Sequence, residues 1–199
     1  YSGQNIESEI IFKSNSQKPI TVTCFINVFG EEDNYERMNS ESVVLFPDKS
    51  QKLKWKIPST EGNPITQVGF SIESDEANSG SLILNYLTFT GEPNCKFSKP
   101  KHIGKHKRGV KFSNAKMWKA SWVDALDKWD SGERTFRVCK DRGRGMLITG
   151  TDLWKNYKVT SDIAIQRVKT GGLAARVQGL NRYYGLVINA SNKLQLIKV

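Results

Sequence analysis

Strict two-residue alternation of apolar and polar side chains is the feature that most limits the fold of this chain. In "KPITVTCFINVFG" apolar residues occupy every second position, and in "QKLKWKIP" Leu53, Trp55 and Ile57 alternate with three lysines. Successive side chains of a strand point to opposite faces, so this pattern predicts strands with one buried face and one solvated face.

Short strands of this kind follow one another from residue 5 to residue 90. Loops rich in Gly, Pro, Asn and Asp separate them, such as "GEEDN" and "STEGNP", and no helical period intervenes. About seven short strands with turn signals between them are typical of an antiparallel β-sandwich. We therefore predict a jelly-roll β-sandwich over residues 1–92.

Charge is divided unequally along the chain. Residues 1–92 hold 7 Lys/Arg and 13 Asp/Glu, a net charge of −6, whereas residues 93–199 hold 23 and 7, a net charge of +16. Opposite signs favour two domains, and an acidic partner is expected to prefer the second. Residues 93–113 contain seven Lys/Arg and no acid, which predicts an exposed basic linker. We favour a solvated tether there, with binding of a polyanion as the alternative.

Residues 114–199 are predicted to form a second β-rich domain. It opens with "MWKASWVDALDKWD", where Trp118, Trp122 and Leu126 are four residues apart and Trp129 follows, a spacing that permits a short amphipathic helix. Strands are expected in "RTFRVCK", "GMLITG", "WKNYKVTSDIAIQRV", "GGLAARVQG", "YYGLVIN" and "KLQLIKV". The sequence ends at Val199 within the last of these, which predicts that this domain is incomplete here. The expected fold class is all-β, with two β-sandwich domains joined by the basic linker.

Several classes of protein are excluded or disfavoured by composition. No run of about 18 apolar residues occurs, so the sequence predicts no membrane span. Cys24, Cys95 and Cys139 are odd in number and lack metal-ligand spacing. This argues against a disulfide framework and favours a reducing, cytoplasmic compartment, with Cys24 as a small core residue. No catalytic motif is present, and "RGRG" between two expected strands indicates a turn, so no catalytic residue is predicted.

Two groups of acidic residues are candidates for a site. Glycoside hydrolysis needs paired carboxylates across a cleft, and "DALDKWDSGE" carries Asp124, Asp127, Asp130 and Glu133. The same spacing describes a solvated helix face, which we favour.

The other acidic group lies in the "GEEDNYER" loop. Glu31, Glu32 and Asp33 are adjacent there, and clustered carboxylates are the hard ligands that Ca²⁺ takes. They are the candidate metal ligands, although we favour a merely solvated loop. No other cofactor is expected.

The strongest candidates for ligand binding lie in "GGLAARVQGLNRYYGLVI". Its alternation predicts a strand with Arg176 and Gln178 on the polar face, and Tyr183 and Tyr184 open the next strand. Aromatic rings stack on sugar rings or bases, and Arg and Gln donate hydrogen bonds to hydroxyl or phosphate oxygens. The alternative is a merely solvated face with one tyrosine packed inward.

Two further aromatic residues are added to this platform. Trp154 and Tyr157 in "TDLWKNYKV" are three residues apart, a spacing that does not follow strand alternation. We expect them at the rim of a sheet, beside the ligand.

Two stretches resemble known families. "LILNYLTFTGEPN" is similar to the closing strand of small jelly rolls found in carbohydrate-binding modules. The stretch from "GRGMLITGTDLWKNYKV" to "KLQLIKV" is similar to laminin-G/concanavalin-A-like sandwiches, with W-x-x-Y, a "GG" strand ending in Arg, "YY" and K-L-x-L. Together they resemble the C-terminal accessory region of ADP-ribosylglycohydrolase-like proteins, over most of 5–92 and 117–199. The catalytic part of that family is an all-α domain with metal-binding acids, and nothing in this chain matches it.

The resemblance implies a non-catalytic ligand-binding or scaffolding region of a larger hydrolase. Its expected ligand is a glycan or an ADP-ribose-like molecule, and its expected partner is the catalytic domain of the same parent protein. One alternative is that the chain helps to form the active unit of an ADP-ribosyl- or glycoside hydrolase. A second alternative is a purely structural or oligomerisation role.

Overall fold

The computed structural model describes residues 1–29, 35–97, 121–131 and 136–199. These residues form strands and no helix, which confirms the all-β prediction. The chain forms two compact units, and the described residues of the second are 122–131 and 136–199. The candidate calcium ligands Glu31, Glu32 and Asp33, and residues 98–113 of the predicted linker, lie outside the described residues.

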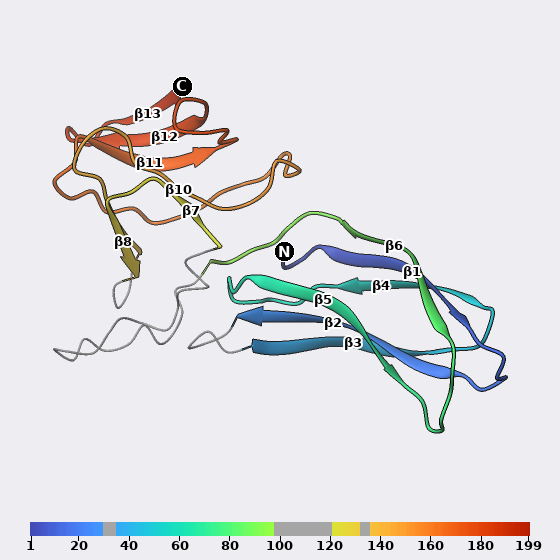
Figure 1. Ribbon diagram of the computed structural model, residues 1–199. Coiled ribbons are helices and arrows are strands. Elements are labelled where there is room, and N and C mark those ends of the chain that lie inside the picture. The colour runs from blue at the N-terminus through green and yellow to red at the C-terminus, as the bar shows by residue number, and fades with distance from the viewer. Residues whose placement is uncertain (30–34, 98–120, 132–135) are drawn as a thin grey trace, which may run out of the picture. The chain divides into compact units, whose positions relative to one another are not determined.

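The described residues of the first unit form two three-stranded antiparallel sheets (Figure 1). One sheet has the order β4-β1-β6 and the other β3-β2-β5. The strands are β1 (Asn5–Lys13), β2 (Ile20–Phe29), β3 (Tyr35–Leu45), β4 (Ser50–Lys56), β5 (Ile65–Glu73) and β6 (Ser81–Thr90). Each sheet therefore has one central strand, β1 or β2, with neighbours on both sides.

The core of the first unit lies between the two central strands. Ile6 and Ile10 of β1 and Val22 and Ile26 of β2 are fully buried. One buried cluster combines Ile6 with Ile26, and a second combines Ile10 with Val22, so the sheets pack face to face. Burying such a side chain contributes about 1.5–3 kcal/mol, and this makes the alternation of β1 and β2 decisive for the fold.

Two small residues, Cys24 and Ser8, complete this core. Cys24 is buried in the cluster around Ile26, which confirms its predicted role, and burial raises the pKa of its thiol to about 11. Ser8 of β1 is fully buried, and its hydroxyl has no hydrogen-bond partner among the described residues. A hydroxyl in this position is destabilising unless it is bonded.

The outer face of the β4-β1-β6 sheet is charged. The three lysines of β4 point outward, as predicted, and Lys54 Nζ lies 2.7 Å from Glu7 Oε1. The bonds from Lys54 and from the Thr90 hydroxyl stabilise the carboxylate and lower the pKa of Glu7. Lysine on the edge strand β4 also hinders pairing with a foreign strand.

The described residues of the second unit form three small sheets of antiparallel strands. They have the orders β10-β7, β8-β9 and β11-β12-β13. The strands are β7 (Val123–Asp124), β8 (Lys128–Ser131), β9 (Phe136–Cys139), β10 (Leu147–Ile148), β11 (Thr170–Ala175), β12 (Tyr184–Asn189) and β13 (Leu194–Lys198). Among the described residues no helix has the length and hydropathy to cross a bilayer.

The amphipathic helix predicted around Trp122, Leu126 and Trp129 is wrong for residues 121–131. The chain forms β7 and β8 there instead, and Trp118 lies outside the described residues. The ring centroid of Trp122 lies 6.3 Å from that of Trp129 and 6.3 Å from that of Phe136 in β9. Trp129 belongs to β8, which pairs with β9, and its side chain is only 9% exposed. Aromatic residues favour strands.

The strand predicted within residues 154–168 is also absent. The chain is irregular from residue 149 to residue 169. Asn156 and Arg167 have φ values of 54° and 56°, in the left-handed region, so they interrupt any extended backbone. The alternation of Val159, Ile163 and Ile165 therefore does not lead to a strand.

Replacing the buried hydroxyl of Ser8 tests the account of the core. Ser8→Ala is expected to raise the free energy of unfolding by about 1 kcal/mol, because an unpaired buried hydroxyl costs about 1–3 kcal/mol. Urea unfolding of the whole chain measures this, with Ile10→Ala as the control that loses about 2–5 kcal/mol. Destabilisation by Ser8→Ala would show that the hydroxyl has a partner and would contradict this account.

The cysteines are expected to differ sharply in reactivity. Cys139 is exposed, whereas Cys24 is buried with a pKa of about 11, so little of its thiol ionises at mildly alkaline pH. A thiol-specific reagent should label Cys139 first in the folded chain and Cys24 only after unfolding. Mass spectrometry of the labelled peptides measures the order, and rapid labelling of Cys24 in the folded state would refute the packing described for β2.

Candidate functional site

The two adjacent tyrosines of the predicted platform have different surroundings. Tyr183 is only 8% exposed, and the guanidinium carbon of Arg144 lies 5.5 Å from its ring centroid. Tyr184 is 44% exposed, and Lys198 Nζ lies 5.9 Å from its ring centroid. Only Tyr184 therefore offers a ring face to a ligand, and the prediction that included Tyr183 is corrected. Alternate residues point to opposite faces, so at most one of the pair was available.

Arg176 and Gln178 do not lie on a strand, in contrast to the prediction. β11 ends at Ala175, and Arg176 has a φ of 51°, which turns the chain out of the sheet. Gln178 lies in the following turn, where its backbone N–H donates to the carbonyl oxygen of Arg182 at 2.8 Å. Both side chains are exposed. Their direction is set by this turn and not by the alternation of a strand.

Trp154 and Tyr157 come together with Arg176. The backbone N–H of Arg176 donates to the Tyr157 hydroxyl at 2.7 Å, and the ring of Trp154 meets that of Tyr157 edge to face at 6.2 Å. Gly150 makes room for this pair, because its φ is 112° and an added Cβ would lie 2.8 Å from the Trp154 ring. Three of the six predicted residues thus form one cluster.

The exposed tyrosine lies close in the sheet to this cluster. Tyr184 is directly opposite Ala175 in the β11–β12 pair, and Arg176 follows Ala175 in the chain. Tyr184 is also directly opposite Lys198 of β13. The same end of the sheet therefore carries an exposed aromatic ring, an arginine and a lysine. Among the described residues the Arg176 guanidinium has no hydrogen-bond or ion-pair partner.

Sequence reasoning missed the role of Arg144. Its Nη1 donates to the carbonyl oxygen of Leu180 at 2.6 Å and to Asn181 Oδ1 at 3.2 Å, so it holds the turn between β11 and β12. The "RGRG" stretch lies between β9 and β10, as predicted, but its sequence does not indicate a hydrogen-bond partner 36 residues away. Arg144 therefore positions the turn that follows Arg176.

The acidic residues near β8 serve the local fold. Asp124 Oδ2 accepts a hydrogen bond from the indole of Trp129 at 3.2 Å. Asp127 accepts from Lys140 Nζ at 2.7 Å and from the backbone N–H of Asp141 at 2.6 Å, and these bonds lower its pKa. Both carboxylates are engaged in these contacts, while Glu133 lies outside the described residues. In the described part of the chain no three His, Cys, Asp or Glu side chains group as metal ligands.

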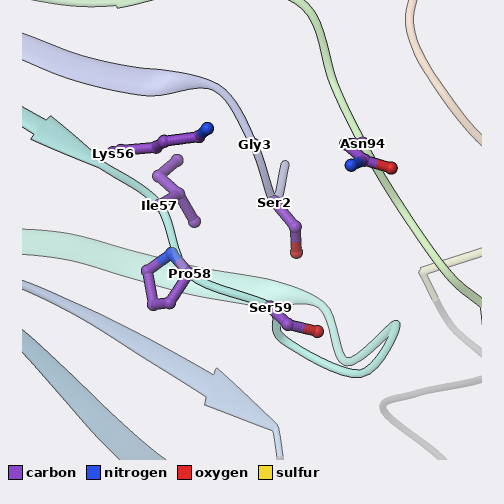
Figure 2. A pocket seen from close by; sticks show the side chains of 7 residues that line it. All are labelled: Ser2, Gly3, Lys56, Ile57, Pro58, Ser59 and Asn94. Atoms are coloured by element: carbon purple, nitrogen blue, oxygen red, sulfur yellow. The ribbon is translucent and has the colours of Figure 1, made fainter.

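A pocket of about 300 Å³ lies in the first unit (Figure 2). Two of its polar groups have structural partners: the Ser2 hydroxyl accepts from the backbone N–H of Thr60 at 3.0 Å, and the Asn94 N–H donates to the Ser2 carbonyl at 2.8 Å. These bonds fix the chain before β1 and after β6. The pocket is lined by Ser2, Gly3, Lys56, Ile57, Pro58, Ser59 and Asn94, none of which belongs to the predicted platform.

Removing the Arg144 side chain is expected to loosen the turn between β11 and β12. Arg144→Ala deletes two hydrogen bonds, and at an exposed site we expect a loss of about 1 kcal/mol, so amide exchange across residues 178–182 accelerates about fivefold. Hydrogen exchange with mass spectrometry measures this, and Arg142→Ala, which removes a nearby exposed arginine, is the matched control. Equal exchange in the two variants would contradict the positioning role.

The second unit thus unites Arg176, Tyr157 and Trp154 and places Tyr184 at the same end of the sheet, while Tyr183 is buried and Gln178 lies in the turn beyond. No known protein family, curated protein or solved structure matches this chain.

Proposed function

We propose that the chain is a non-catalytic binding region of a larger hydrolase, and that its second unit binds an ADP-ribose-like ligand. The observation that carries this proposal is the hydrogen bond between the Arg176 N–H and the Tyr157 hydroxyl. It holds an aromatic pair against the turn from which the Arg176 side chain extends, and Tyr184 lies opposite the neighbouring residue. Such preorganised groups bind at a low entropic cost.

The chemistry of these side chains favours a ligand with phosphate groups. The exposed ring of Tyr184 offers a face for stacking on a base or a sugar, and the charged groups of Arg176 and Lys198 suit phosphate oxygens. The described residues of the second unit hold 13 Lys/Arg and 6 Asp/Glu, a net charge of +7. A neutral glycan uses the aromatic ring but gains little from this charge.

The resemblance to the accessory region of ADP-ribosylglycohydrolase-like proteins supports the same reading. We also propose that the first unit is a jelly-roll sandwich and that the second is a concanavalin-A-like sandwich. The catalytic domain of the parent protein is the proposed partner. Calcium binding in the loop around Glu32 and polyanion binding by the basic linker also belong here as separate proposals.

One observation favours a structural role as the second candidate. Leu186, Leu194 and Leu196 are exposed on one face of the β11-β12-β13 sheet. Apolar side chains that gather on one surface usually mark a contact with another polypeptide. A scaffolding function would use this face and not the cluster around Arg176.

Titration with ADP-ribose distinguishes these candidates. The whole chain is expected to bind ADP-ribose in isothermal titration calorimetry, and Arg176→Ala and Tyr184→Ala are each expected to weaken binding about tenfold, since each removes about 1.4 kcal/mol of contact. Lys193→Ala is the matched control, because it removes one positive charge from the second unit outside the cluster. An array of neutral glycans tests whether the chain binds uncharged sugars instead of ADP-ribose.

Three results would decide against the proposal. Binding of neutral glycans with no binding of ADP-ribose would show that the ligand is a neutral glycan and not an ADP-ribose-like molecule. Equal losses of ADP-ribose affinity in Arg176→Ala and Lys193→Ala would mean that net charge causes the loss, and not a contact of Arg176 with the ligand. If no ligand binds and both variants only lower the melting temperature, the structural role is the better account.

A further inference from the structure

β13 forms one edge of the three-stranded sheet of the second unit (Figure 1). It pairs with β12 on one side, and among the described residues no strand pairs with its other side. An edge strand of this kind is a template for a further strand. We propose that an extended, acidic and apolar segment of a partner protein adds to the sheet along β13.

The backbone of β13 shows which groups face the free edge. The Val199 N–H donates to the Tyr183 carbonyl at 2.9 Å and the Tyr183 N–H to the Val199 carbonyl at 3.1 Å, so Val199 is bonded toward β12. In an antiparallel ladder every second residue bonds to the same neighbour. The N–H and C=O groups of Leu194, Leu196 and Lys198 therefore point away from β12. They form the donor and acceptor row that an added strand requires.

The side chains of β13 are apolar at the same positions. Leu173, Leu186 and Leu196 are directly opposite one another across β11, β12 and β13. Leu173 is half-buried, Leu186 is 44% exposed and Leu196 is 79% exposed, while Leu194 is 63% exposed. Exposure thus rises toward the free edge. A fourth strand with an apolar residue opposite Leu196 would extend this row and cover its outer side.

Partial cover explains why exposure falls toward β11. The Cγ1 atom of Ile165 lies 3.6 Å from the position that a Cβ atom would take on Gly171. The irregular segment that carries Ile165 also carries Tyr157, which is bonded to Arg176 at the end of β11. This segment reaches β11 but leaves Leu194 and Leu196 exposed.

Charge selects an acidic occupant. Lys193 precedes β13 and Lys198 ends it, so each end of the exposed leucine pair carries a positive charge. The second unit has a net charge of +7, which opposes pairing of β13 with the same strand of a second copy. Acidic residues flanking a short apolar core in the incoming segment match this pattern. Recognition by strand addition draws affinity from the backbone and specificity from alternate side chains.

The proposed strand addition goes beyond the proposed function and does not depend on it. The cluster around Arg176 lies at the end of β11, whereas Leu194 and Leu196 lie on β13 at the opposite edge of the sheet, and Lys198 takes part in both proposals. Loss of ADP-ribose binding in the Arg176→Ala variant would leave strand addition unaffected, because Arg176 takes no part in it.

Designed peptides test strand addition to the whole chain. The probe is a nine-residue peptide in which Leu and Thr alternate over five residues between two Glu at each end. It should bind, and replacing its Glu by Lys or N-methylating its Leu residues should weaken binding about tenfold or more. Leu196→Asn and Leu194→Asn in the chain should each weaken binding about fivefold. Leu153→Asn is the matched control, because Leu153 is also 79% exposed.

Hydrogen exchange provides a readout specific to the backbone. The amides of Leu194, Leu196 and Lys198 should gain protection when the acidic peptide binds, whereas those of Gln195 and Ile197 should change little. Circular dichroism confirms that each variant is folded.

Three outcomes would overturn the proposal. One is binding of acidic and basic peptides with equal affinity. Another is dimerisation of the free chain that depends on Leu196, seen by analytical ultracentrifugation. The third is Leu196-dependent binding to phosphatidylserine vesicles with no binding of the acidic peptide.

Discussion

Burial of alternate residues on two central strands is the constraint on which the first unit depends. β1 and β2 each have hydrogen-bonded neighbours on both sides, so their inward residues lie at the centre of both sheets. Every other strand of the unit is placed by its pairing with one of these two. The polar outer faces, including the Glu7–Lys54 pair, follow from the same alternation and contribute less because they remain hydrated.

The sequence predicted those features that depend on local alternation. The core positions of β2, the lysines of β4 and the buried Cys24 could all be read from every second residue. The helix predicted around Trp122 was wrong because the four-residue apolar spacing fits a helix, whereas residues 128–131 pair with β9 as a strand. The strand within residues 154–168 was wrong because positive φ at Asn156 and Arg167 cannot be inferred from apolar alternation.

The candidate site depends mostly on contacts that are distant in sequence. Arg176 meets Tyr157 across 19 residues, and Arg144 meets Leu180 across 36. Residue types identified Arg176, Tyr157 and Trp154 as suitable for binding, but their association arises from the turn after β11 and the irregular segment before it. The burial of Tyr183 was one of two outcomes for the tyrosine pair, and tertiary packing decided between them.

The turn at Arg176 has a consequence for how this protein can diverge. Within a strand, packing and surface chemistry are encoded by separate sets of residues, so natural variation can change one set while the other is conserved. At Arg176 that separation ends, because one residue supplies both a left-handed backbone bend and an exposed guanidinium group. Glycine and asparagine adopt such a bend easily but carry no charge. Related chains that replace this arginine by either residue would therefore keep the turn and lose the charge.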